Sequence, residues 1–134
     1  MIKHARVLLL ALAAAVFVAV PVAQAKGTRA AATVTVTAGK PSEFSFTLSS
    51  KSVAKGSVTF NVTNKGNVPH DFKVCSATTT AASATTCAGK GTPLISPGSS
   101  GKLTVTFKKS GKYEYLCTVA GHAAAGMKGL LTVK

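Results

Sequence analysis

Three side chains that could bind a metal lie close together near the end of the sequence. Cys117, His122 and Met127 stand in the spacing C-x4-H-x4-M. The alternating residues 113–117 predict a strand before this loop, and the loop itself is almost wholly Ala and Gly. A thiolate, an imidazole and a thioether together favour copper over magnesium or calcium, which prefer oxygen ligands. Each residue alone has an ordinary explanation, because a single Cys, His or Met is most often a packing residue.

A copper site with two imidazoles, one thiolate and a weak axial thioether needs a second histidine. The chain has three histidines, and His4 lies in a predicted leader segment, which leaves His70 as the candidate. The only methionine besides the initiator is Met127. His70 lies between a predicted turn at residues 64–67 and a predicted strand that starts with Phe72 and Val74. The strand would fix the backbone of His70, and the side chain would project beyond the end of the sheet. The joint placement therefore favours one copper ion over four unrelated packing residues.

Residues 64–72, N-K-G-N-V-P-H-D-F, together with the C-x4-H-x4-M motif, resemble the cupredoxin family, especially its small plastocyanin/azurin-like members. The resemblance implies a type 1, or blue, copper centre in which His70, Cys117 and His122 are the strong ligands. Met127 would then be the weak axial ligand. The family's function is one-electron transfer between redox proteins, and the resemblance implies the same function here.

The same resemblance suggests a contact beside the ligands. In the family the first histidine ligand usually precedes Asn, whereas Asp71 follows His70 in this chain. A carboxylate only accepts hydrogen bonds, so we expect Asp71 to accept one from Thr118. An exposed Asp in a turn, with no such contact, is the alternative.

The family also uses the outer edge of its second histidine ligand as the electron port. Small apolar residues around His122 would let a partner approach that edge closely, unless these residues simply pack inside the protein. The expected port residues are Ala120, Gly121, Ala123, Ala124 and Ala125.

Residues 1–25 have the pattern of a secretory signal peptide. Lys3 and Arg6 form its charged start, Val7–Val20 its apolar stretch, and Ala23–Ala25 an A-x-A cleavage site. An uncleaved membrane anchor is the alternative, but a 14-residue apolar stretch is short for a membrane span. We therefore expect an exported protein, located in the periplasm, outside the cell or at the cell envelope.

The cysteine count supports export with one metal-binding thiol. Three cysteines in an exported protein leave one unpaired, and Cys117 is the candidate for that role. Cys75 and Cys87 can then form a disulfide, which an oxidising compartment permits. The disulfide would tether residues 76–86, which consist only of Ala, Ser and Thr and show no deciding period.

Short alternating segments separated by turn residues predict an all-β domain over residues 33–134, with an insertion loop at 75–92. Residues 26–32 form a basic tail before it. Seven or eight such strands indicate an antiparallel Greek-key β-sandwich. The expected core residues are Phe44, Phe46, Phe60, Phe72, Val105 and Phe107.

The chain is strongly basic, with a formal net charge of +13. Without Lys3 and Arg6 this becomes +11. Nucleic-acid binding is one interpretation, but the lysines are scattered between strands and we expect no nucleic-acid partner. An acidic redox partner or an anionic membrane surface fits better, and a solubilising surface without any partner is equally compatible.

Counting ligands disfavours catalysis. No histidine remains for a second copper centre, and four protein ligands leave no open position for a substrate. No C-x-x-C-H haem motif is present. We expect a monomeric electron carrier that is not an enzyme and has no small-molecule substrate. A copper carrier or delivery protein is the alternative, and an interaction domain in which metal is incidental is the third possibility.

Overall fold

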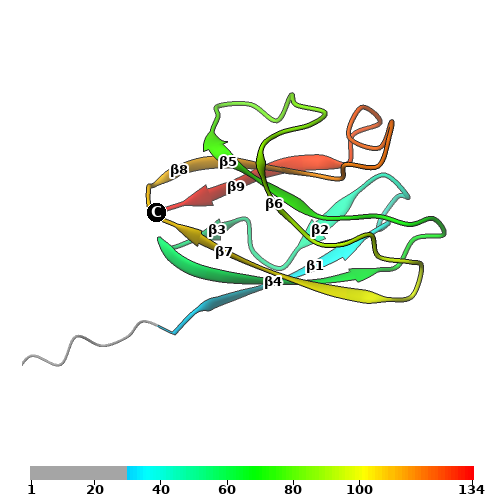
Figure 1. The fold of residues 1–134 in the computed structure, drawn as a ribbon, viewed down its shortest axis with the longest axis horizontal. Helices are drawn as coiled ribbons and strands as arrows, with labels where there is room; N and C mark the ends of the chain where they lie inside the picture. Colours follow the sequence, from blue (N-terminus) through cyan, green and yellow to red (C-terminus); the bar gives the residue numbers. More distant parts are fainter. Residues whose placement is uncertain (1–29) are drawn as a thin grey trace, which may run out of the picture.

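A computed structural model describes residues 30–134, which fold into nine β-strands without a helix (Figure 1). The predicted signal peptide and residues 26–29 of the basic tail lie outside the described residues. None of the described residues belongs to a helix that is long and apolar enough to span a membrane. The strands are β1 (Ala32–Ala38), β2 (Phe46–Leu48), β3 (Ser52–Val53), β4 (Gly56–Asn64), β5 (Lys73–Thr78), β6 (Gly89–Gly91), β7 (Ser100–Phe107), β8 (Gly111–Leu116) and β9 (Lys128–Val133).

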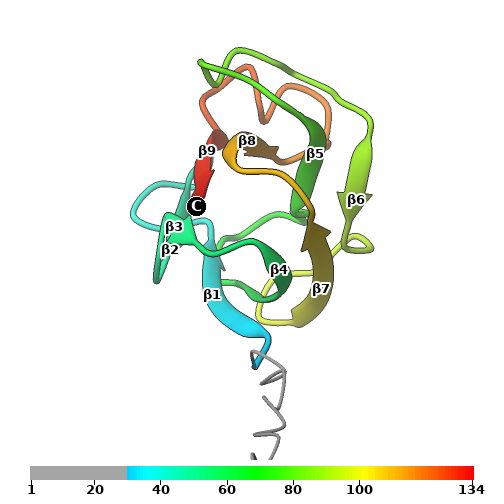
Figure 2. The ribbon, with the colours of Figure 1, turned by 90° about the vertical axis from the view of Figure 1, so that its left-hand side faces the viewer.

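The strands form two sheets that pack face to face (Figure 2). One sheet has the order β2-β1-β4-β7 and the other the order β3-β9-β8-β5-β6. The predicted all-β sandwich is confirmed. Two of the seven strand pairs, β1 with β4 and β3 with β9, are parallel, so the sheets are mixed. Alternation in a sequence shows which side chains share a face, but it does not show the direction of the neighbouring strand.

Period-two alternation accounts for the core between the sheets. In β4, the side chains of Val58, Phe60 and Val62 are at most 1% exposed and point inward, while Ser57 and Asn61 face solvent. The rings of Phe60 and Phe72 pack with centroids 5.3 Å apart across the core. Of the other residues predicted to lie in the core, Phe107 is buried, and Phe46 and Val105 pack against the cluster while partly exposed.

The prediction that Phe44 belongs to the core is wrong, because its side chain is 41% exposed. Strand β2 begins only at Phe46, so Phe44 lies in the preceding loop and is not subject to the alternation of the strand. Its ring instead lies beside the ring of His122.

The predicted disulfide between Cys75 and Cys87 is confirmed and tethers the insertion to β5. The enclosed segment of Ala, Ser and Thr, residues 76–86, also packs on strands β8 and β9. The backbone N–H of Ala84 donates to the buried Glu114 carboxylate at 3.0 Å, and Lys128 Nζ donates to the carbonyl of Ser83 at 3.2 Å. The insertion is therefore a covering layer on β8 and β9, and it includes the short strand β6, which its composition did not predict.

The two ends of the sandwich differ in what their loops contain (Figure 1). We call one the site end; it carries the loops 39–45, 64–72 and 117–127, which include the predicted copper ligands. The opposite end carries the loops 49–55 and 108–110 together with the final residue of β9 and Lys134. Strands β4 and β8 run the length of the molecule between these ends.

Candidate metal centre

His70 reaches the site from a tight turn that follows β4. Asn64, fully buried, accepts the backbone N–H of Gly66 at 2.8 Å and donates to the carbonyl oxygens of Val68 and Ile95. His70 then forms a two-hydrogen-bond bridge with the backbone of Ile95. These backbone contacts hold the buried imidazole in place at the end of the sheet.

Cys117 and His122 come from the loop that joins β8 to β9. The backbone N–H of Cys117 donates to the carbonyl of Met127 at 3.0 Å, which closes the loop at its base. Within it, His122 N–H donates to the carbonyl of Val119, and Met127 N–H donates to the carbonyl of His122, both at 3.0 Å. Gly121 and Gly126 have φ of 82° and 109°, a left-handed region that glycine adopts readily, so the small residues allow this tight path.

The donor atoms of His70, Cys117 and His122 all lie within 4.8 Å of one another. The two Nδ1 atoms are 3.1 Å apart, and the Cys117 sulfur is 3.5 Å from His122 Nδ1. His70 and Cys117 are fully buried, and His122 is half-buried. The structure thus brings two imidazoles and a thiol together, although 47 positions separate His70 from Cys117.

Met127 lies directly beside this trio. It is fully buried and packs in a small cluster with Cys117 and Ala38, which Phe46 and Val119 flank. The same loop hydrogen bonds that position His122 also fix the backbone of Met127. A soft thioether next to a thiol and two imidazoles is the donor set that suits copper, so the residues present fit this metal.

The protonation states of the site also fit a metal. Burial raises the pKa of the Cys117 thiol to about 11, while the backbone N–H groups of Asp71 and Val119 act in the opposite direction. Burial and the adjacent His70 lower the pKa of His122, which favours its neutral imidazole. A metal binds neutral imidazole and thiolate, and it supplies the positive charge that deprotonates a coordinating thiol.

Glu43 is a component of the site that the sequence did not indicate. Its carboxylate accepts a hydrogen bond from His70 Nε2 at 2.9 Å, and the same group accepts the backbone N–H of Asn67 and of Val68. The hydrogen bond to Asn67, followed by that from His70, lowers the pKa of Glu43 to about 2. Since an ionised carboxylate only accepts, Nε2 of His70 carries a proton, which leaves Nδ1 of the neutral ring as the atom that can bind a metal.

Gly66 leaves the space in which Glu43 and His70 meet. A Cβ atom at this position would overlap the Glu43 carboxylate and lie 2.9 Å from His70 Nε2. Glu43 itself sits in a loop of no regular pattern, 27 positions before His70. The one signal available in the sequence was that the chain has only three acidic residues, of which Glu43 is one.

Asp71 and Thr118 link the two segments that carry His70 and Cys117. The carboxylate of Asp71 accepts the backbone N–H of Thr118 at 2.6 Å, and its other oxygen accepts the Thr118 hydroxyl. This is the contact expected from the sequence. Each partner is the residue directly after a donor of the trio, so the contact holds the two segments together beside the site.

The surface around His122 differs in part from the predicted electron port. Ala120, Gly121, Ala124 and Ala125 are exposed, but Ala123 is only 2% exposed and does not belong to the surface. It packs instead with Leu116 and Cys75, against the disulfide-tethered insertion. The aromatic neighbour of His122 is Phe44, whose ring centroid lies 4.9 Å from that of the imidazole.

Comparison with protein families places the fold and site in a known context. Residues 32–134 match the model of the copper binding proteins of the plastocyanin/azurin family. A segment of 41 residues is 49% identical to the copper-resistant cuproprotein CopI of Pseudomonas aeruginosa, and covers 31% of this chain and 23% of that protein. The chain spans less than two thirds of the length of the curated relatives that it matches.

Solved structures share the architecture over most of the chain. Auracyanin B superposes with a TM-score of 0.61 at 27% identity, covering 78% of this chain and 89% of that one. Rusticyanin of Thiobacillus ferrooxidans superposes with a TM-score of 0.56 at 28% identity, covering 76% of each chain. Both likenesses extend across the sandwich.

Proposed function

The chain belongs to the plastocyanin/azurin family of copper-binding proteins, and we propose that it carries single electrons between redox proteins by means of one type 1 copper ion. The observation that supports this proposal most directly is the convergence of two imidazoles and a thiol in a buried site beside a thioether. When bound, copper supplies a one-electron couple between Cu(II) and Cu(I).

Each residue of the site has a role in this proposal. Nδ1 of His70, Nδ1 of His122 and the sulfur of Cys117 would be the three strong donors to the ion, and the sulfur of Met127 would be a weak one. Their positions depend on backbone hydrogen bonds within the sandwich and the loop, which would hold the donors around the ion. Glu43 orients the His70 ring from its outer side.

A donor set that is held in place favours electron transfer. Cu(II) and Cu(I) prefer different geometries, and donors fixed by the fold limit the rearrangement between them. The Asp71–Thr118 contact contributes because it joins the two segments that carry His70 and Cys117. His122 is half-buried, so its outer edge provides the path to a redox partner at the apolar surface formed by Phe44 and the exposed alanines.

The proposal includes location and assembly. Residues 1–25 would direct export and be removed, which leaves the tail 26–32 and the domain 33–134 with its insertion at 75–92. An oxidising compartment suits the Cys75–Cys87 disulfide. The protein would act as a monomer. It would have no enzymatic activity and no small-molecule substrate, because four protein donors leave no open position at the metal.

The test is reconstitution of residues 26–134 with Cu(II). We expect one copper per chain, an intense visible absorption band and reversible redox cycling. Cys117→Ser should abolish the band because the intense transition requires the thiolate sulfur. As a control, Ser110→Ala removes an exposed hydroxyl from the loop 108–110 at the opposite end of the sandwich, and should keep the band. An unchanged spectrum in the Cys117 variant would show that the site is assigned wrongly.

A second function is favoured by one comparison. The relative from Pseudomonas aeruginosa is named a copper-resistant cuproprotein, which suggests copper handling in place of electron transfer. Mixing the Cu(I) form with a Cu(I) chelator of known affinity distinguishes the two functions. Rapid loss of the ion supports delivery, whereas retention together with fast electron exchange supports the carrier.

A further inference from the structure

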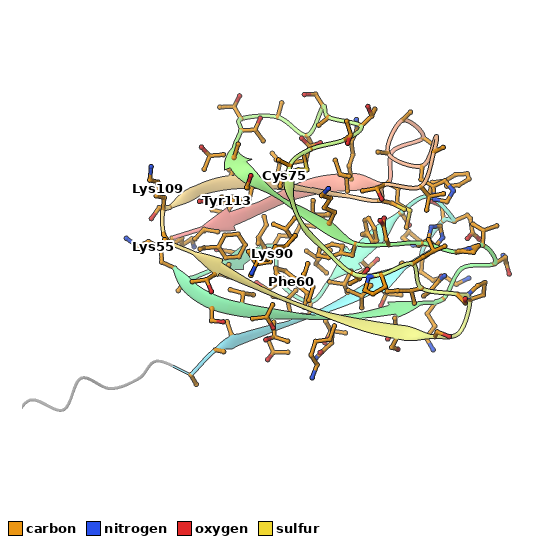
Figure 3. All side chains as sticks on the ribbon, viewed as in Figure 1. Lys55, Phe60, Cys75, Lys90, Lys109 and Tyr113 are labelled. Atoms are coloured by element: carbon orange, nitrogen blue, oxygen red, sulfur yellow. A yellow bond between two sulfur atoms is a disulfide. The ribbon has the colours of Figure 1, made fainter. Side chains whose placement is uncertain are left out.

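Half of the lysines in the described residues gather at the end of the sandwich opposite the site. Neighbouring backbone groups place them there: the N–H of Lys55 donates to the carbonyl of Lys134, and the N–H of Thr132 donates to that of Lys51. Lys112 pairs with Thr132 across β8 and β9. Figure 3 shows Lys55 and Lys109 together at this end. We call this surface the lysine end; it consists of Lys51, Lys55, Lys108, Lys109, Lys112 and Lys134, all exposed.

No acidic side chain lies at the lysine end. The chain has three acidic residues; Glu43 and Asp71 lie at the site end, and the buried Glu114 binds the backbone of Ala84. Among residues 30–134, the one contact within 4.0 Å between a basic and an acidic side chain is that of His70 with Glu43. Six ammonium groups therefore share one surface without a carboxylate side chain between them.

The lysine end is far from the donor cluster. Lys112 lies near the start of β8 and Cys117 directly follows its last residue, so the two are separated by about 17 Å at the usual rise of a strand. A molecule bound to the lysines would not touch His122 or Phe44. The lysine end is consequently not the surface through which electrons reach the site, and its charge calls for a different partner.

The chemistry of this surface fits lipid headgroups better than a protein or a nucleic acid. In the part of the chain that the structure describes, the exposed large apolar side chains are Phe44, Val68 and Leu94, and they belong to loops near the site. The lysine end thus lacks the aromatic and arginine anchors typical of protein interfaces. It also offers no exposed aromatic ring for stacking with bases. Clusters of four to eight basic side chains are typical of surfaces that bind anionic lipid.

The course of the chain agrees with this orientation. Ala32, the first residue of β1, pairs with Val58 near the start of β4, so the chain enters the sandwich at the lysine end.

We propose that the lysine end binds the anionic headgroups of a lipid bilayer and leaves the site end directed away from the membrane. The binding itself depends only on the lysines, whereas its purpose rests on the proposed electron carrier. A carrier held in this way could exchange electrons through the His122 surface while confined to the membrane surface. The attraction is electrostatic and weakens as salt rises.

The experiment uses copper-loaded residues 26–134, which contain every strand and both sheets, and sedimentation with lipid vesicles. We expect binding to vesicles of phosphatidylcholine with 30% phosphatidylglycerol, and none to phosphatidylcholine alone. The triple variant Lys55→Gln, Lys109→Gln, Lys112→Gln should bind about a hundredfold more weakly, at about fivefold for each lysine. The control triple Lys40→Gln, Lys65→Gln, Lys102→Gln changes the net charge equally and should bind less than about tenfold more weakly.

Orientation is measured separately by acetylation of lysines on the vesicle-bound protein. Lys55 and Lys109 should be protected, while Lys40 and Lys65 react as in solution. Equal weakening by both triples, or absence of binding to anionic vesicles, would overturn the proposal. The proposal would also be overturned if the protein bound a double-stranded oligonucleotide or an acidic protein more tightly than the vesicles, and if the Lys55, Lys109 and Lys112 triple variant weakened that binding as strongly. The visible copper band is recorded in each sample. A protein that shows the band but does not bind anionic vesicles would refute this inference and leave the proposed electron carrier unaffected.

Discussion

Replacement of Glu43 by Gln tests whether a carboxylate behind His70 tunes the copper site. The Glu43 carboxylate accepts from His70 Nε2 at 2.9 Å and also holds the turn through Asn67 and Val68. Gln has nearly the same shape and keeps one oxygen acceptor, so the substitution mainly removes the negative charge. A carboxylate paired with a histidine ligand raises the basicity of that ligand and orients its ring.

The magnitude follows from the position of the carboxylate one hydrogen bond behind the ligand. Loss of such a partner typically lowers metal affinity about 10- to 100-fold. The negative charge stabilises Cu(II) more than Cu(I), so the affinity for Cu(II) should decrease more. Each tenfold decrease in the affinity for Cu(II) relative to the affinity for Cu(I) raises the one-electron potential by about 59 mV. We therefore expect the midpoint of Glu43→Gln to rise by up to about 100 mV.

The assay combines voltammetry, Cu(II) competition with a chelator, and NMR of the metal-free protein. The Nε2 proton of His70 should be visible and slow to exchange in the wild type, and faster to exchange in the variant. Glu114→Gln is the matched control, because it removes the same charge from a buried carboxylate that binds Ala84 and contacts no donor of the site. It should leave the potential nearly unchanged.

Two outcomes would refute this reasoning. Equal shifts in Glu43→Gln and Glu114→Gln would indicate a general effect of net charge. An unchanged potential and Cu(II) affinity in Glu43→Gln would mean that the carboxylate serves only to stabilise the turn at residues 64–68.

Three further predictions concern the axial donor, the disulfide and pH. Met127→Leu should raise the potential and keep the visible band, whereas Met127→Gln should lower the potential; voltammetry showing shifts in one direction would indicate a packing residue. Replacing Cys75 and Cys87 by Ser should lower the free energy of unfolding by about 3 kcal/mol, given the 12-residue separation, and urea titration that shows no loss would contradict this. The pKa of Glu43 is lowered to about 2, so its contribution to the stability of the metal-free protein is complete above about pH 4.5 and is lost as the pH falls towards 2. The difference in unfolding free energy between wild type and Glu43→Gln should therefore disappear over that range, and a constant difference would contradict the assignment.

Several features of this protein could be predicted from the sequence because they depend on residue type and local spacing. The alternation in β4 and β8 requires only that neighbouring side chains point to opposite faces, so it predicts a sandwich from short windows. The disulfide followed from an odd cysteine count, since the Cys117 thiol was assigned to the metal. The gathering of His70 with Cys117 and His122 was expected from donor chemistry and from resemblance to a family.

Other features were decided only by the tertiary structure, because they join segments that have no common period. Glu43 contacts His70 across 27 positions, and Phe44 lies outside the core because β2 begins two residues later. Ala123 belongs to a loop of small residues, yet the insertion covers it and removes it from the surface. The lysines appear scattered in the sequence, but the chain reverses direction between strands in such a way that six of them lie at the lysine end. Local patterns specify the face on which a side chain lies, whereas the partner it meets depends on how turns and strand order fold distant segments together.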